Sequence, residues 1–223
     1  MEARHLRNVP ALSADECALL GTKRVAVIGC GGLGGYLIEY LARIGVGAIV
    51  AVDGDVFEPS NLNRQLLSVP GNLGISKAEA AARRVREIDP EIQVQAVHAF
   101  LTEDNARTLI RGCDGVLDGL DTIPARRILE KACTEEGIPL FHGAIQGWVA
   151  QAAVCLPGDV LMDRLYPEDV EVRDRSVLSF TPALCAAMQT SLCVKWLTGR
   201  PVESGKLYFY DLLHQEYAEI PMI

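Results

Sequence analysis

The feature that most constrains the fold is a glycine-rich turn that follows a short apolar run. Residues 25–28 are continuously apolar, and Gly29-Cys30-Gly31-Gly32-Leu33-Gly34 follows them directly. Apolar residues then recur at helical spacing over 33–44, and a second apolar run covers 49–52. A strand, a glycine-rich turn, a helix and a second strand form a βαβ unit, which predicts a parallel sheet with a right-handed crossover.

The spacing of these glycines indicates that the turn binds phosphate. Glycine accepts positive φ and lets the backbone approach a ligand closely. The helix that follows presents unpaired N–H groups and about half a positive charge at its N-terminus. Asp53 ends the second apolar run about 20 residues after the turn, where an acid binds ribose hydroxyls. We therefore predict a nucleotide site that includes Gly29, Gly31, Gly32, Gly34 and Asp53.

The rest of the chain continues the alternation of strands and helices before the pattern changes. Helical patterns or capping signals cover 13–20, 76–88, 103–111, 124–136 and 182–197, and strand patterns cover 92–97, 116–117 and 138–141. Residues 148–156 follow the last of these strands without a helix, and 207–210 and 216–220 suggest a closing hairpin. The predicted class is α/β: a Rossmann-like, mostly parallel sheet with helices on both faces and an antiparallel C-terminal extension.

We expect one domain over 1–223, because the chain shows no repeat, low-complexity tract or linker. Within it, 1–22 form an N-terminal arm and helix, and 23–156 form the nucleotide-binding core. Residues 157–180 are a polar, proline-punctuated crossover connection, and 181–223 supply the last helix and hairpin. Long connections of this kind are often functional.

Composition narrows the classes of function. The net charge of −8 argues against a nucleic-acid or membrane-surface protein. No apolar run approaches the roughly 20 residues that span a bilayer, and the polar start carries no signal peptide. A cytoplasmic protein is therefore expected. The seven cysteines are scattered and include no Cys-x-x-Cys pair, so we expect reduced thiols and no zinc.

Polar residues beyond Asp53 indicate which nucleotide binds. The segment Asn61-Leu62-Asn63-Arg64-Gln65 follows the acid, Lys77 begins a later helix, and Asp121 follows a later strand. Two cations and a carboxylate near a helix N-terminus suit a triphosphate with a metal ion better than a dinucleotide. An NAD(P)-dependent oxidoreductase remains the main alternative, and a non-catalytic nucleotide-binding subunit is another.

At these residues the chain resembles the ThiF/MoeB/HesA family, relatives of the ubiquitin-activating enzymes. The resemblance covers nearly the whole chain and rests on an ordered set of motifs: the glycine turn, Asp53-x-Asp55, Ser60-Asn61-Leu62-Asn63-Arg64-Gln65, Gly74-x-x-Lys77 and Asp118-x-x-Asp121. It implies a homodimeric adenylyltransferase that uses ATP and Mg²⁺ and releases pyrophosphate. The acceptor it implies is the C-terminal glycine of a ubiquitin-like sulfur carrier (ThiS/MoaD-like) or a small carboxylate in cofactor biosynthesis.

The resemblance also implies a role for each site residue. The glycine turn would lie against the phosphates, Asp53 would bind the ribose, and Asp121 would hold Mg²⁺. Contacts to the phosphates would come from Asn61, Arg64 and Lys77, with Gln65 as support. The remaining members of the predicted nucleotide site are Asp55, Ser60 and Thr122, the last standing where the family often has Asn. Arg7, in the segment Arg4-His5-Leu6-Arg7, would reach the ATP site of the partner subunit as an arginine finger.

Each assignment has a structural alternative. Asp121 would otherwise cap the helix that contains Pro124. Lys77 would be a solvated first-turn lysine, Arg64 an interface ion-pair residue, and Arg7 part of a disordered arm. Asp55 is expected to order its loop rather than meet the metal, and His142 to be structural or at the surface.

Two departures from the family concern sulfur. Many relatives carry two Cys-x-x-Cys pairs, and none is present here. Relatives that form thioesters or transfer sulfur place a cysteine in the crossover connection, yet 157–180 contain none. Cys155 falls in the preceding strand, and Cys185 and Cys193 fall on the late apolar helix, where we expect them in the core. The sequence therefore favours carboxylate activation over a covalent thiol step.

Overall fold

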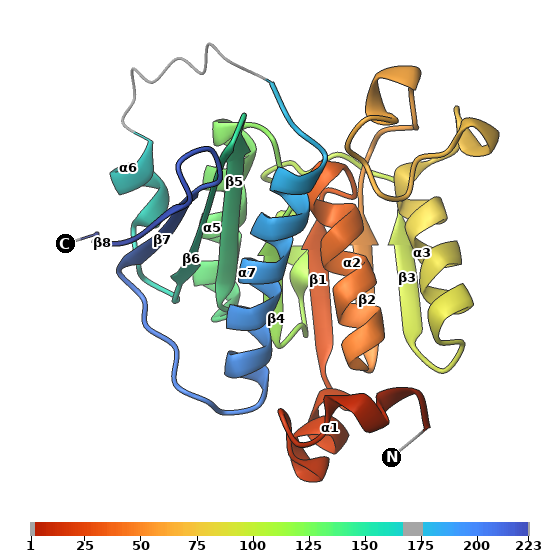
Figure 1. The fold of residues 1–223 in the computed structure, drawn as a ribbon, viewed down its shortest axis with the longest axis horizontal. Coiled ribbons are helices and arrows are strands. Elements are labelled where there is room, and N and C mark those ends of the chain that lie inside the picture. The colour runs from red at the N-terminus through yellow and green to blue at the C-terminus, as the bar shows by residue number, and fades with distance from the viewer. Residues whose placement is uncertain (1–2, 167–175, 223) are drawn as a thin grey trace.

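The computed structural model describes residues 3–166 and 176–222, which form one eight-stranded sheet in the order β3-β2-β1-β4-β5-β6-β7-β8 (Figure 1). The strands are β1 (Arg24–Ile28), β2 (Ala48–Val52), β3 (Gln93–Val97), β4 (Gly115–Asp118), β5 (Leu140–Gln146), β6 (Val149–Cys155), β7 (Lys206–Asp211) and β8 (Glu216–Pro221). Strands β1 to β5 pair in parallel, and β5 to β8 pair antiparallel. The predicted mostly parallel sheet with an antiparallel extension is confirmed.

Helices cover both faces of this sheet (Figure 1). They are α1 (Ala14–Leu20), α2 (Gly32–Ile44), α3 (Lys77–Ile88), α4 (Ala106–Ile110), α5 (Ile123–Glu136), α6 (Leu161–Leu165) and α7 (Phe180–Leu197). The short 3₁₀ helices are η1 (Ala3–Asn8), η2 (Pro59–Asn61) and η3 (Pro70–Asn72). Alternation along β1 divides the interior in two, because Val25 and Val27 pack towards α2, α3 and α7 while Ala26 and Ile28 pack towards α4, α5 and α6.

The chain order reverses between β1 and β4, which are neighbours in the sheet. Successive strands run from β1 to β2 and β3 on one side, and from β4 to β5 on the other. In open α/β sheets, ligands bind beyond the carboxyl ends of the strands at such a reversal. The glycine turn follows β1 at this point, so the fold and the sequence indicate the same position for a ligand site.

Three local predictions need correction. Of the predicted capping signals, the one at Ser13 forms a complete capping box with Glu16. At α3 only half of a capping box forms: Ser76 accepts a hydrogen bond from the Glu79 N–H, without the reciprocal bond. Strand β5 continues to Gln146 because it pairs along its whole length with β6. The connection over 157–180 contains α6, whose Leu161 and Met162 are buried, while 167–175 lie outside the described residues.

In the part of the chain that the structure describes, no helix combines the length and apolarity needed to cross a membrane.

Candidate active site

The glycine turn brings three backbone segments into close contact. Gly29 has φ +94°, and a Cβ on it would lie 2.5 Å from the carbonyl oxygen of Gly119, at the end of β4. A Cβ on Gly34 would lie 1.7 Å from the carbonyl oxygen of Gly29. Neither position has room for a side chain, so α2 starts tightly against the end of β1. This contact places the first turn of α2 beside the loop that follows β4.

The N-terminus of α2 has no side chain closing it. Its cap residue is Gly31, and no side-chain hydrogen bond caps the helix. Gln65 lies over Gly31, where an added Cβ would be 3.5 Å from its amide nitrogen, and Arg64 approaches Gly32. Gln65 is 7% exposed, and its Oε1 has no partner among the described residues. Free helix N–H groups, a buried unpaired amide and a nearby cation fit the phosphates of a nucleotide.

Asp53 fixes the turn from the end of β2. Its Oδ2 accepts a hydrogen bond from the Cys30 N–H at 2.7 Å, and its Oδ1 accepts one from the Asp55 N–H at 2.8 Å. Each carboxylate oxygen keeps a further lone pair for another donor. Asp53, the residue predicted to bind the ribose, is therefore held rigidly beside the turn. Phe100, which the sequence reasoning missed, packs its exposed ring against Gly54 next to this carboxylate.

Segment 60–65 forms part of an ordered loop over the turn. Asn61 is buried, and its Oδ1 accepts a hydrogen bond from the Glu58 N–H at 3.0 Å. Arg64 is half-buried, and it donates to the Ser60 carbonyl at 2.8 Å and to Asn63 Oδ1 at 3.0 Å. Asn61 thus holds the loop, while Arg64 is kept near Gly32 without an acidic partner among the described residues. The phosphate contacts of Asn61 and Arg64, and the membership of Ser60 in the nucleotide site, stay predictions.

Lys77 is not a solvated lysine, so that alternative is wrong. It is 7% exposed at the start of α3, and its Nζ pairs with Asp55 Oδ2 at 3.1 Å. The Lys77 N–H also donates to the Asp55 carbonyl at 3.0 Å. Asp55 therefore orders the loop after β2, as expected, and holds the Lys77 ammonium at the same edge as Asp53.

Asp121 is exposed and makes no hydrogen bond or ion pair with any described residue. The cap position of α5 belongs to Thr122, and no side chain closes that helix. The structure therefore gives no support to the alternative in which Asp121 is a helix cap. A free carboxylate two residues beyond Gly119, beside the glycine turn, fits a single protein ligand to a magnesium ion bound with a triphosphate. Among the described residues, no three His, Cys, Asp or Glu side chains converge on one point.

Arg7 lies in the N-terminal segment, which Figure 1 shows below the sheet, beside the end of α2 that is away from the glycine turn. It belongs to η1, which packs on the last turn of α2: Asn8 donates to the Ile44 carbonyl at 3.2 Å, and the His5 ring lies against Gly45. Residues 3–8 of the arm are therefore ordered, contrary to the alternative for Arg7. The Arg7 guanidinium is exposed and has no partner among the described residues. Within one chain, Arg7 and the turn are not brought together.

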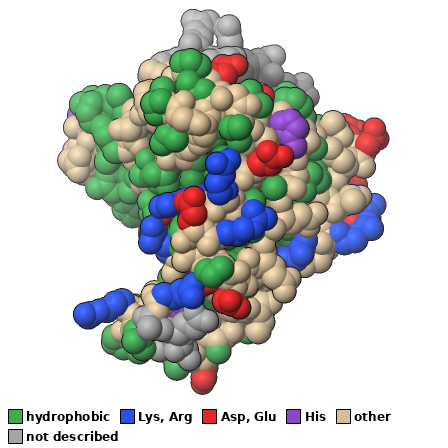
Figure 2. Space-filling model, turned by 90° about the vertical axis from the view of Figure 1, so that its right-hand side faces the viewer, with side chains coloured by type: hydrophobic (Ala, Val, Ile, Leu, Met, Phe, Trp, Pro, Cys, Tyr) green, Lys and Arg blue, Asp and Glu red, His purple; other side chains and the backbone are tan. Residues whose placement is uncertain are grey.

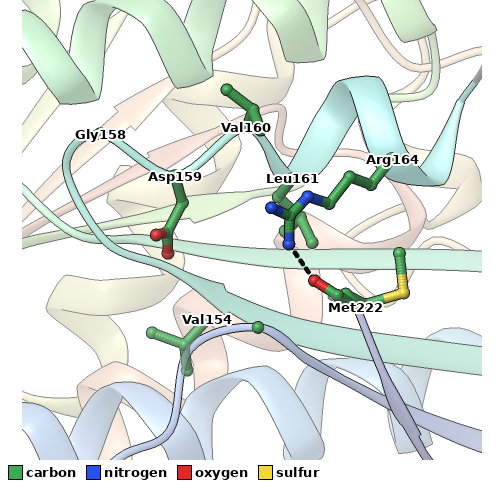
Figure 3. A pocket seen from close by; sticks show the side chains of 8 residues that line it. Val154, Gly158, Asp159, Val160, Leu161, Arg164 and Met222 are labelled. Atoms are coloured by element: carbon green, nitrogen blue, oxygen red, sulfur yellow. Dashed lines mark hydrogen bonds between the residues drawn. The ribbon is translucent and has the colours of Figure 1, made fainter.

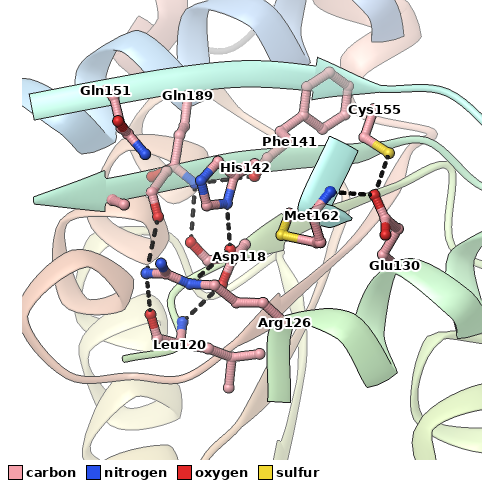
Figure 4. A network of polar contacts seen from close by, with 12 residues as sticks. Asp118, Leu120, Arg126, Glu130, Phe141, His142, Gln151, Cys155, Met162 and Gln189 are labelled. Atoms are coloured by element: carbon pink, nitrogen blue, oxygen red, sulfur yellow. Dashed lines mark hydrogen bonds and ion pairs between the residues drawn. The ribbon is translucent and has the colours of Figure 1, made fainter. Parts of the chain in front are cut away.

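A buried polar network lies beneath the loop that carries Asp121 (Figure 4). Asp118 and His142 are completely buried and 2.7 Å apart, and Arg126 and Tyr166 complete the group. The sequence pointed to Asp118 as a strand-end residue but left His142 as structural or surface, and it missed Arg126 and Tyr166. Their partners lie 24 to 40 residues apart, so no local spacing reveals them.

The cysteines of the late helix, Cys185 and Cys193, are in the core, as predicted, and Cys155 of β6 is buried as well. Burial raises the pKa of Cys185 to about 12, and it also raises the pKa values of Cys155 and Cys193 well above their usual range. A thiol in that state is a poor nucleophile at neutral pH. None of the three is prepared for a thioester or persulfide step.

A small cavity of about 110 Å³ lies away from this site, between the turn after β6, α6 and the C-terminal strand (Figure 3). Val154, Asp159, Leu161 and Met222 are among its lining residues, and the Arg164 guanidinium donates to the Met222 carbonyl. The cavity contains none of the predicted site residues.

Comparison with known proteins decides the family. Residues 2–223 match the ThiF family. The chain belongs to the ThiF family. It is 38% identical over 208 residues to the SAMP-activating enzyme E1 of Haloferax volcanii, covering 90% of this chain and 77% of that protein. It is 31% identical to the sulfur carrier protein adenylyltransferase of Thermus thermophilus, covering 95% and 83%.

A further relative agrees with this membership, and a solved structure shows the same fold. The probable adenylyltransferase/sulfurtransferase MoeZ of Mycobacterium tuberculosis is 34% identical, and the alignment covers 98% of this chain but 58% of MoeZ. The crystal structure of E. coli MccB with MccA has a TM-score of 0.84 at 19% identity, covering 100% of this chain and 72% of MccB. The predictions of a ThiF-family chain and of an adenylyltransferase are confirmed.

Proposed function

We propose that this ThiF-family chain uses ATP and Mg²⁺ to adenylylate a carboxylate, with release of pyrophosphate. One observation carries the proposal most directly: an uncapped helix N-terminus, two cations and a carboxylate that makes no hydrogen bond or ion pair with a described residue lie at one edge of the sheet. Gln65 and the turn would hold phosphates, Asp53 the ribose, and Asp121 the metal ion. The exposed Phe100 ring, packed on Gly54, would stack on the base.

The reaction requires positive charge near the phosphates rather than a general base. A carboxylate oxygen attacks the α-phosphorus of ATP, an oxygen–phosphorus bond forms, and the bond to the pyrophosphate oxygen breaks. The nucleophile is already ionised at neutral pH, so no general base is required. Arg64 and Lys77 would offset the repulsion between the two anions and stabilise charge that grows in the transition state. The metal ion would supply further charge neutralisation on the phosphates.

The acceptor is the C-terminal glycine of a ubiquitin-like sulfur carrier or a small carboxylate of cofactor biosynthesis. Relatives that are named for a sulfur carrier and for SAMP favour the first. No cysteine lies in 157–180, and the buried thiols have raised pKa values, so we propose that the reaction on this chain ends at the acyl adenylate.

We further propose that two copies share the site, with Arg7 acting in trans. Arg7 has no partner among the described residues, and η1 packs on the last turn of α2, at the end of that helix opposite the glycine turn, so Arg7 does not serve the turn of its own chain. Exposed apolar residues flank Arg64, namely Leu62, Leu66, Val69, Leu73 and Ile75. Figure 2 shows apolar side chains over the upper part of this side of the molecule, with Lys and Arg side chains below them. Such a surface suits a second copy.

ATP–pyrophosphate exchange tests the function. Exchange that needs both Mg²⁺ and a carrier ending in Gly-Gly would support a protein acceptor, and exchange with free carboxylates would support a small one. The variant Asp121→Asn should keep the fold and lose about 10²–10³-fold in exchange. Tight NAD(P) binding without exchange with any acceptor would instead support the oxidoreductase alternative.

Mixing tests the shared site. Arg7→Ala and Lys77→Ala proteins should each be inactive, and a mixture allowed to exchange subunits should regain activity, because one site of each mixed dimer keeps both residues. A mixture that forms mixed dimers without regaining activity would contradict the proposal.

A further inference from the structure

In the turn at Leu120 and Asp121, buried side chains beneath it bind both the N–H and the carbonyl of Leu120. The Leu120 N–H donates to Asp118 Oδ1 at 2.9 Å, and the Leu120 carbonyl accepts from Arg126 Nη2 at 2.7 Å. Just before this turn, the Gly119 N–H donates to the Ile28 carbonyl at 2.8 Å. Asp121 comes next; its carboxylate makes no hydrogen bond or ion pair with a described residue, but it interacts electrostatically with the Arg126 guanidinium. Asp118 and Arg126 therefore hold the backbone that carries the Asp121 carboxylate.

Asp118 and Arg126 are in turn fixed by His142. A carboxylate only accepts hydrogen bonds, so His142 Nδ1 carries the proton and donates to Asp118 Oδ2 at 2.7 Å. Its Nε2 is then an acceptor, and it receives the Tyr166 hydroxyl proton at 3.2 Å. The Tyr166 hydroxyl accepts from Arg126 Nη1 at 2.8 Å and from Gln151 Nε2 at 3.2 Å. Each of these hydrogen bonds joins a donor to an acceptor, and Figure 4 shows the positions of Asp118, Arg126, His142 and Gln151.

Burial of these side chains stabilises this pattern of hydrogen bonds. The side chains of Asp118 and His142 are both 0% exposed, and Arg126 is 7% exposed, so water cannot replace a lost partner cheaply. Gln189 from α7 adds a bridge, donating to the Asp118 and Phe141 carbonyls at 2.9 Å each. The Arg126 guanidinium balances the Asp118 charge at 3.4 Å. Apart from Arg126 Nε, which meets Asp118 as an ion pair without a hydrogen bond, the buried polar atoms of these side chains have hydrogen-bond partners, and such a network favours one arrangement.

We propose that His142 and Tyr166 are positioning residues for the metal site, acting through Asp118, Arg126 and the Leu120 backbone on the Asp121 carboxylate. The inference rests on the proposed function, since it takes Asp121 as the metal ligand. Residues that orient a metal ligand from behind typically change metal affinity or activity by about 10–100-fold when replaced. The effect should therefore appear in metal-dependent binding and not in nucleotide binding as such.

Two substitutions at His142 separate its two contacts. In His142→Asn the amide nitrogen takes the place of Nδ1 and keeps the donor to Asp118. In His142→Gln the amide reaches towards Tyr166 and the donor to Asp118 is lost. Tyr166→Phe removes the hydroxyl that joins Arg126 to His142. A matched control is His214→Gln, because His214 forms another His–Asp pair, with Asp211 at 2.8 Å, on the exposed β7–β8 hairpin.

The test is calorimetric titration of each protein with ATP, once with Mg²⁺ and once with EDTA. In wild type and His214→Gln, Mg²⁺ should tighten ATP binding; in His142→Gln and Tyr166→Phe that gain should fall by about 10–100-fold, while binding in EDTA changes by no more than about twofold. In His142→Asn, Mg²⁺ should tighten ATP binding almost as much as in wild type. Tyr166→Phe carries the test if His142→Gln does not fold.

Equal loss of binding with and without Mg²⁺ in the folded variants, or no loss in either, would overturn the inference. A wild-type protein that binds no ATP would instead overturn the proposed function. The same variants should also need more Mg²⁺ for half-maximal exchange, with the KM for the acceptor unchanged.

Discussion

The ion pair between Lys77 and Asp55 offers a sharp test of whether Lys77 serves the fold or the phosphates. The two charges are 3.1 Å apart, which corresponds to about 5 kcal/mol of attraction at an effective dielectric constant of about 20 and about 1.3 kcal/mol in water. The Asp55 side chain is 57% exposed, so the pair lies towards the water limit. Desolvation of Lys77 offsets much of what remains, and such pairs contribute about 0–1 kcal/mol net.

Lys77→Met keeps the apolar stem and removes the ammonium. The free energy of unfolding should fall by no more than about 1 kcal/mol, because the exposed Asp55 carboxylate left behind is solvated. If Lys77 contacts phosphates, exchange should fall by about 10²–10³-fold, or about 2.7–4 kcal/mol in the barrier. The matched change Asp55→Asn breaks the same pair and keeps the ammonium, so it should lose much less activity than Lys77→Met at similar stability.

Urea unfolding followed by fluorescence gives the stability, and pyrophosphate exchange at saturating acceptor gives the activity. The reasoning is refuted if Lys77→Met is strongly destabilised while its folded fraction exchanges at the wild-type rate. Equal losses of activity in Lys77→Met and Asp55→Asn would show that the ion pair itself, rather than the free cation, matters.

Further predictions follow from individual contacts. Gly34→Ala should destabilise the fold by at least about 1–3 kcal/mol in urea unfolding, because its Cβ would meet the Gly29 carbonyl at 1.7 Å, whereas Gly71→Ala, which has open space, should change little. Phe100→Ala should weaken ATP binding by about 0.5–1.5 kcal/mol in calorimetry without affecting pyrophosphate affinity; equal weakening of both would contradict base stacking. Burial lowers the pKa of His142, so the unfolded chain binds more protons below about pH 6.5 and stability should fall as the pH drops through that range. His142→Asn should flatten this dependence of Tm on pH, and an unchanged slope would argue against it. His214 contributes with the opposite sign, because Asp211 raises its pKa.

The glycine turn and the position of Asp53 beside it were predictable because their signals are local. Gly29 and Gly34 are close in the chain, and the need for glycine at both is visible in the spacing and explained by the contact with the Gly29 carbonyl. Asp53 follows β2 at the expected distance, and its carboxylate lies on the turn. The alternation of β1 residues between two cores likewise follows from strand geometry.

The parts that escaped prediction depend on contacts between distant residues. His142 was predicted only to be structural or at the surface, because nothing near it in the chain shows that Asp118 and Tyr166 contact its two ring nitrogens. Helix α6 is five residues long and is held by packing of Leu161 and Met162 rather than by a sequence pattern. The pairing of Lys77 with Asp55 also joins two elements that spacing alone does not bring together.

The most direct test of the central claim follows the oxygen atoms of the acceptor. A carrier peptide ending in Gly-Gly, with its terminal carboxylate labelled with oxygen-18, is incubated with the protein, ATP and Mg²⁺, and the product is cleaved with hydroxylamine. Attack of the carboxylate on the α-phosphorus predicts labelled AMP, detected by mass spectrometry, and its loss in Asp121→Asn. Unlabelled AMP, or label in inorganic phosphate, would contradict adenylylation of the carboxylate at this site.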